Sequence, residues 1–127
     1  MKRIVLVAFV CLYCGLTFAQ QKTTVTGLEK HDISMKDAAA MTKKYQSSMA
    51  KKSVKGGLFG REIIDRILSQ QAVKGLRIYN ATKAGGSSTF VVVGVDSAGN
   101  DLKAGVLGED TLPCPPFCGA ANELNNK

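Results

Sequence analysis

The sequence predicts an α+β domain in which two helices pack on a three-stranded antiparallel meander and a C-terminal tail covers part of the sheet. Two observations lead to this prediction. Apolar side chains recur at helical spacing over residues 33–49 and 58–71, and the chain after Gly75 changes to the two-residue alternation of strands. Helices in one part of a chain and strands in another are typical of an α+β fold.

The first predicted helix spans residues 33–49. Ser34 is expected to cap its N-terminus, with Asp37 three residues later as its partner. Apolar side chains at helical intervals form one stripe, which we expect to be buried. The stripe consists of Ala38, Met41, Tyr45 and Met49.

The second predicted helix spans residues 58–71 and is strongly amphipathic. Its outer face pairs Arg61 with Asp65, four residues apart, which favours a weak ion pair. Its apolar face is explained by core packing and does not indicate a ligand site. That face consists of Phe59, Ile63, Ile64, Ile67 and Leu68.

Three strands are predicted over residues 76–81, 89–96 and 102–107. The middle strand is apolar on both faces, which is typical of a strand covered on both sides. Two helices cover only one face of such a sheet, so we expect the tail after Gly108 to cross the other face, with a second subunit as the alternative. One face carries Phe90 and Val92, and the other carries Val91, Val93 and Val95.

The N-terminus predicts a secretory signal peptide over residues 1–19. A basic start at Lys2 and Arg3 precedes an apolar run over residues 4–16, and small residues follow at a cleavage site that ends at Ala19. The run is shorter than the roughly 20 apolar residues of a spanning helix, so we expect no membrane span. The protein is therefore expected to be exported, either periplasmic, on the cell surface or secreted.

The remaining chain is predicted to form one domain. Residues 20–33 are polar and are expected to be flexible, residues 34–120 form the α+β domain, and residues 121–127 are expected to be disordered. No feature settles the oligomeric state, so both a monomer and a homodimer stay open.

Positive charge is concentrated in the first half of the predicted domain. The whole chain carries a formal net charge of +7, which falls to +5 when the signal peptide is removed. A window without acidic residues is interpreted first as a solvated helix end and loop, and its alternative is a contact for an anionic polymer or a membrane surface. The window contains Lys43, Lys44, Lys51, Lys52 and Lys55.

Several classes of function are not expected. Arginines are few and no aromatic residues interleave with the lysines, which argues against a nucleic-acid partner. His31 is the one histidine, and it lies in the segment expected to be flexible, so we predict no catalytic triad, no metal site and no cofactor. A less favoured hypothesis is that the protein is an enzyme with an unrecognised site at Arg77 and Tyr79.

The tail contains Pro-Cys-Pro-Pro-Phe-Cys, which we interpret as a structural disulfide. Removal of the signal peptide leaves Cys114 and Cys118 as the remaining cysteines, and an exported chain meets an oxidising compartment. Pro115 and Pro116 cannot donate to a sheet, so the segment is not expected to extend one. The bridge would hold Phe117 at its bend, either packed on the sheet or displayed to a partner.

Short motifs add resemblances. Residues 71–75 read Gln-Ala-Val-Lys-Gly and resemble the wedge of cystatins, although here they are expected to join a helix to a strand and the chain has no tryptophan. Residues 80–82 form an N-glycosylation triplet. Residues 96–98 and 110–112, Asp96-Ser97-Ala98 and Asp110-Thr111-Leu112, are similar to acceptors of O-glycosylation in exported proteins of some Gram-negative bacteria, and both are expected in accessible turns.

Residues 34–118 resemble a group of small exported bacterial proteins of uncharacterised function, most specifically in Val-Gly-Val-Asp-Ser-Ala-Gly-Asn-Asp-Leu and in the Cys-Pro-Pro-Phe-Cys tail. The resemblance implies an exported α+β protein and no catalytic residue. We therefore expect a non-enzymatic binding module that contacts an unknown protein or an anionic envelope polymer through the lysine window or the tail. The alternative is a small periplasmic inhibitor or modulator of a hydrolase.

Overall fold

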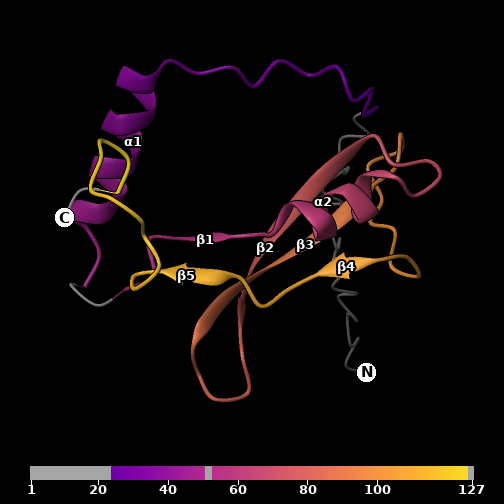
Figure 1. Cartoon of the computed structure of the whole chain (residues 1–127). Helices are drawn as coiled ribbons and strands as arrows, with labels where there is room; N and C mark the ends of the chain where they lie inside the picture. Colours follow the sequence, from indigo (N-terminus) through magenta and orange to yellow (C-terminus); the bar gives the residue numbers. More distant parts are fainter. Residues whose placement is uncertain (1–23, 51–52, 126–127) are drawn as a thin grey trace, which may run out of the picture.

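The structure is a computed structural model that describes residues 24–50 and 53–125. It is an α+β fold, as the sequence predicts, with two antiparallel sheets, β2-β3-β4 and β1-β5 (Figure 1). Residues 1–19, the predicted signal peptide, lie outside the described residues. The elements are α1 (Met35–Ser47), β1 (Gly56–Leu58), α2 (Arg61–Leu68), β2 (Gly75–Thr82), β3 (Ser88–Val95), β4 (Leu107–Gly108) and β5 (Leu112–Cys114).

The predicted hairpin and the order of the meander are confirmed. β2 and β3 pair from Gly75 opposite Val95 to Thr82 opposite Ser88, and β3 also pairs with β4. The alternation of side chains along β2 follows directly from this register, because successive residues of a strand point to opposite faces.

The predicted third strand over residues 102–107 is wrong in its bounds. β4 is confined to Leu107–Gly108, and a turn precedes it in which the Gly105 N–H donates to the Leu102 carbonyl at 3.1 Å. Gln70, just after α2, explains the short strand: its side-chain oxygen accepts from the Val106 N–H at 2.6 Å and its amide donates to the Val106 carbonyl at 3.2 Å. A helix-end side chain thus occupies the backbone groups that a longer ladder would need.

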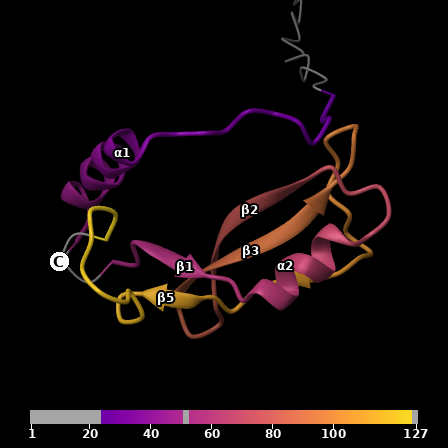
Figure 2. The ribbon, with the colours of Figure 1, turned by 45° about the horizontal axis from the view of Figure 1, so that its top comes forward.

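α2 covers the face of the sheet that carries Val92 (Figure 2). Ile67 and Val92 are both fully buried. Gly108 allows the close approach, because a Cβ atom there would lie 2.8 Å from Val92 Cγ1 and 2.9 Å from Ile63 Cγ1. Among the described residues the buried apolar core is small, and it consists of Ile67, Val92, Val93 and Val95.

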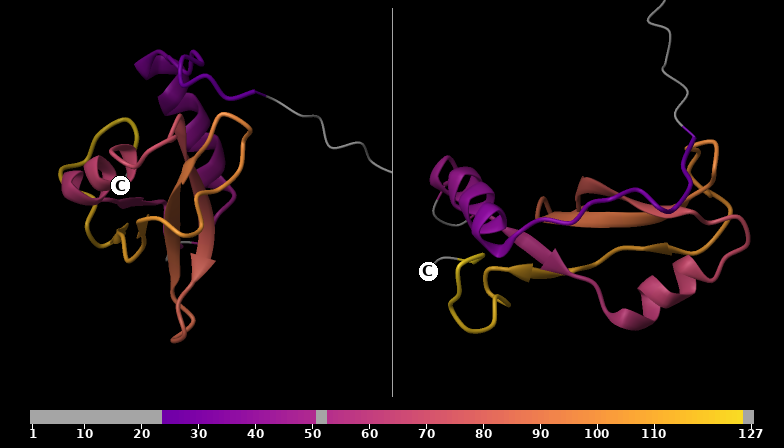
Figure 3. Two further views of the ribbon diagram at one scale, coloured as in Figure 1. Left: turned by 90° about the vertical axis from the view of Figure 1, so that its right-hand side faces the viewer. Right: turned by 90° about the horizontal axis from the view of Figure 1, so that it is seen from above.

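The prediction that both helices pack on the sheet is wrong for α1. Its predicted cap is confirmed, since the Asp37 N–H donates to Ser34 Oγ at 3.1 Å. The helix nevertheless stands beyond one end of the sheet (Figure 3), and none of its residues is buried. Met41 and Tyr45, predicted to be buried, are 64% and 58% exposed. The apolar stripe of α1 has no large β-branched residues, whereas the isoleucines of α2 bury more apolar surface against the sheet.

The tail takes a different course from the one predicted. A Cβ atom at Gly57 of β1 would lie 2.9 Å from Phe90 Cδ2 and 2.5 Å from Thr111 Oγ1, which puts the β1-β5 ribbon beside Phe90. Phe90 shares its face with Val92, so this part of the tail borders the face that α2 covers. Coverage of the second face by the tail is therefore not found.

The second face is bordered by the N-terminal segment and by polar side chains of β2. The Val25 N–H donates to the Ser97 carbonyl at 2.9 Å, next to the end of β3. Arg77 and Tyr79 lie opposite Val93 and Val91 in the register, so their side chains share this face. Residues 24–33 contain no helix or strand.

The predicted disulfide pair is present in the tail. Cys114 and Cys118 are bonded, with Cα atoms 4.6 Å apart, and β5 ends at Cys114, directly before the two prolines. The buried Asn125 side chain donates to the carbonyls of Cys118 and Ala120, at 2.9 and 2.8 Å. Residues 121–125 of the segment expected to be disordered therefore have a defined place around the bridge.

We expect Gly108→Ala to lower the free energy of unfolding by about 1–3 kcal/mol, because the added methyl group overpacks the contact between α2 and β3. Denaturant unfolding measures this. Gly56→Ala is the matched control, since a Cβ atom at that strand glycine meets nothing within 4 Å. Equal stability of the two variants would contradict the close approach of α2.

We expect Cys114→Ser/Cys118→Ser to lower the melting temperature by a few degrees, because a five-residue ring contributes about 2 kcal/mol of chain entropy. Differential scanning calorimetry measures the shift, and thiol counting under denaturing conditions accompanies it. Free thiols at both of these positions would show that the bridge does not form.

Candidate functional site

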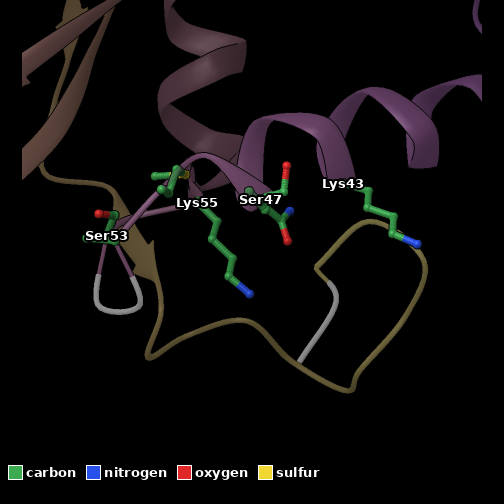
Figure 4. A pocket seen from close by; sticks show the side chains of 7 residues that line it. Lys43, Ser47, Ser53 and Lys55 are labelled. Atoms are coloured by element: carbon green, nitrogen blue, oxygen red, sulfur yellow. The ribbon is translucent and has the colours of Figure 1, made fainter.

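The C-terminal half of α1 and the segment that leads into β1 line an open cavity of about 640 Å³ (Figure 4). We call it the lysine pocket. It joins two of the lysines that the sequence singled out, which are twelve positions apart in the chain. Its described lining residues are Lys43, Gln46, Ser47, Met49, Ala50, Ser53 and Lys55.

Local structure places each wall of the lysine pocket. Lys43 and Ser47 lie four residues apart on α1 and therefore share a helix face. Lys55 lies directly before β1, and its N–H donates to the Cys114 carbonyl at 2.6 Å. Figure 4 shows the Lys43 and Lys55 side chains extending toward the same side of α1.

The C-terminal loop fixes the relative position of these walls. The Gln46 amide donates to the Leu124 carbonyl at 2.7 Å, and the Lys55 ammonium donates to the Asn125 carbonyl at 2.8 Å. Because Asn125 also bonds to Cys118, the disulfide and the lysine pocket belong to one hydrogen-bonded unit. The sequence alone gave no sign of this connection.

The chemistry of the lysine pocket suits an anionic group. None of its described lining residues is acidic, and the hydroxyl groups of Ser47 and Ser53 belong to the same lining. Gln46 Oε1 is buried without a hydrogen-bond partner in the described part of the chain, and a protonated or hydroxylated ligand group would satisfy it. The C-terminal end of α1 disfavours an anion, and the lysine charges offset that effect.

The structure places the five lysines of the predicted window differently. Lys43 and Lys55 line the lysine pocket, whereas Lys44 lies in the last turn of α1 and is absent from its described lining. A cation in that turn stabilises the helix end by itself, which fits the alternative of a solvated helix terminus. Lys51 and Lys52 lie outside the described residues.

Phe117 is displayed rather than packed. Phe117 is 59% exposed, and its N–H donates to the carbonyl of Pro113, the residue before the disulfide ring, at 2.8 Å. Of the two alternatives that the sequence leaves open, packing on the sheet is therefore wrong. The bend presents an aromatic ring on a covalently closed loop.

Arg77 and Tyr79 meet a residue that sequence reasoning missed. The Tyr79 hydroxyl donates to Asp101 Oδ2 at 2.6 Å, and Arg77 binds Asp101 Oδ1 and the Gly99 carbonyl. The hydrogen bond with Tyr79 and the charge of Asp101 raise the pKa of Arg77. These contacts tie the 96–101 turn to β2, so the cluster has a structural explanation.

The N-terminal segment contains the one histidine and a strongly held carboxylate. Hydrogen bonds from the Thr26 N–H and hydroxyl, at 2.7 and 2.9 Å, hold the pKa of Glu29 at about 2, below its ordinary 4.5. Glu29 and His31 line a cavity of about 380 Å³ beside Arg77. Across residues 24–50 and 53–125, no group of three or more His, Cys, Asp or Glu side chains could hold a metal ion.

The short motifs also have defined places. Residues 71–75 join α2 to β2, unlike the hairpin wedge of cystatins. Ser97 lies in an exposed turn, whereas Thr111 is only 4% exposed, which corrects the expectation that both acceptor triplets are accessible. In the described part of the chain, no helix is long and apolar enough to cross a membrane.

Comparisons with protein-family models, with curated proteins and with solved structures find no match.

Proposed function

We propose that the chain is an exported, non-enzymatic binding module that holds an anionic envelope polymer in the lysine pocket. The observation that carries this proposal is the convergence of Lys43 and Lys55 on one cavity without a described acidic lining residue. Two cations near hydroxyl and amide groups recognise a carboxylate or phosphate by charge and by hydrogen bonds.

Export is part of this proposal. Its support is the basic start, the apolar run over residues 4–16 and the small residues before Gln20. The bonded pair Cys114 and Cys118 adds to it, because disulfides persist in oxidising compartments.

The physics favours a polymer over a small anion. An exposed ion pair contributes only about 0–1 kcal/mol, so one carboxylate at two lysines binds weakly. A polymer repeats its charge along the chain, so neighbouring anionic groups contact the two lysines as linked events, and the second contact forms at high effective concentration. Such binding weakens with added salt, because exposed charges are screened within about 10 Å at 0.1 M.

We expect Lys43→Gln to weaken binding of polygalacturonate by about two- to five-fold, the loss of one exposed charge contact. Isothermal titration calorimetry at low and high salt measures this, with binding strongest at low salt. Lys103→Gln is the control, since it removes the same charge at an exposed position outside the lysine pocket. Equal weakening by both variants would reduce the effect to net charge and contradict the site.

A second candidate is a hydrolase inhibitor that inserts Phe117 into its target, favoured by the exposed ring on the disulfide-closed loop. Rigid aromatic anchors of this kind dominate many binding surfaces. If it holds, the protein inhibits a papain-like protease or a lysozyme at micromolar concentration, Phe117→Ala abolishes inhibition, and Lys43→Gln leaves it unchanged. Absence of inhibition of both enzymes would argue against this candidate.

A further inference from the structure

A second cavity, of about 600 Å³, adjoins the lysine pocket. Met49 and Ser53 line both cavities, so the two are neighbours, and we call them together the groove. We call the second part the hydroxyl cavity. Tyr45 of α1 and Met49, just after the helix, lie on one side, and the end of the β2-β3 hairpin lies on the other.

The hydroxyl cavity exists because α1 stands away from the sheet. The apolar stripe of α1 would close this space if it packed on the hairpin, but Tyr45 stays 58% exposed. Tyr45 therefore lines a cavity of about 600 Å³. Phe90 from β3 supplies a second aromatic surface in the same cavity.

The polar lining of the hydroxyl cavity is rich in neutral hydrogen-bonding groups. None of its described lining residues is charged, in contrast with the lysine pocket. Its hydroxyl and amide side chains come from Ser53, Asn80, Thr82, Ser87, Ser88 and Thr89. Such groups act both as donors and as acceptors, which matches a ligand that carries many hydroxyl groups of its own.

One of these hydroxyls is without a partner. Thr89 is only 5% exposed, and among the described residues nothing forms a hydrogen bond with its Oγ1 atom. Buried polar groups are nearly always paired, so an unpaired hydroxyl beside a cavity points to a polar group that enters it. This observation is independent of the lysines.

We propose that the groove binds an acidic polysaccharide, with a sugar ring in the hydroxyl cavity and a carboxylate in the lysine pocket. A sugar ring presents an apolar C–H face to an aromatic ring and hydroxyl groups at its edge, which are the two surfaces that Tyr45 and the hairpin residues offer. This inference rests on the proposed function, because it names the class of anionic polymer that the lysine pocket holds.

The test compares three probes by isothermal titration calorimetry on the exported, oxidised protein: polygalacturonate, poly-L-glutamate of matched length, and dextran. We expect polygalacturonate to bind more tightly than the other two. Tyr45→Ala should weaken polygalacturonate binding by about five-fold, the effect of one lost aromatic contact, and leave poly-L-glutamate binding unchanged. Met41→Ala is the matched control, since Met41 is an exposed apolar residue of α1 outside the described lining of both cavities.

The outcomes separate the two proposals. Equal or tighter binding of poly-L-glutamate, unchanged by Tyr45→Ala, would overturn the sugar site, indicate an acidic peptide partner and leave the lysine pocket standing. Binding of dextran as tightly as polygalacturonate would support the sugar site and refute the role of the lysines. Binding of none of the probes would overturn both. Thermal melting of Tyr45→Ala at the wild-type temperature confirms that a loss of binding is not a loss of fold.

Discussion

The contact of α2 with the centre of the sheet organises the rest of the chain. Ile67 is fully buried there against the face that carries Val92, and Gly108 removes the side chain that would hold the helix away. Burying such a side chain contributes about 1.5–3 kcal/mol, a large share of the stability of a small domain. Because few residues are buried, the other elements pack around this contact of α2 with the sheet.

α1 is the element that this core excludes. One helix and the β1-β5 ribbon already border the Val92 face, and Arg77, Tyr79 and the N-terminal segment border the other. α1 is instead held at the end of the sheet through Gln46, whose amide reaches the C-terminal loop. The two cavities of the groove lie along this helix, so the same packing that leaves its apolar stripe exposed also creates the groove.

The disulfide is linked to the groove indirectly, through the hydrogen bonds of the C-terminal loop. It closes the bend around Phe117 and positions Cys118, whose carbonyl accepts from the buried Asn125 side chain. Asn125 in turn accepts from Lys55 in the wall of the lysine pocket. The free energy that this disulfide contributes is too small to hold a domain together. It is sufficient to order this loop, because the loop is short and the bridge fixes the backbone groups that its hydrogen bonds use.

The sequence by itself determined the features that depend on neighbouring residues. The cap of α1 at Ser34, the alternation along β2 and β3 and the pairing of Cys114 with Cys118 all follow from local geometry and from few available partners. The sequence pointed to Phe117 but did not predict that its side chain is exposed, because exposure depends on what the rest of the chain covers.

Only the tertiary structure decided the contacts between distant segments. Gln70 shortens β4, Asp101 joins Arg77 to Tyr79, and Asn125 reaches Lys55, each across a separation that periodicity does not encode. The same holds for the groove. A stripe of apolar residues tells which side of a helix prefers to leave water, but whether the sheet has room for it depends on the competing helix, and here α2 has the larger isoleucine face.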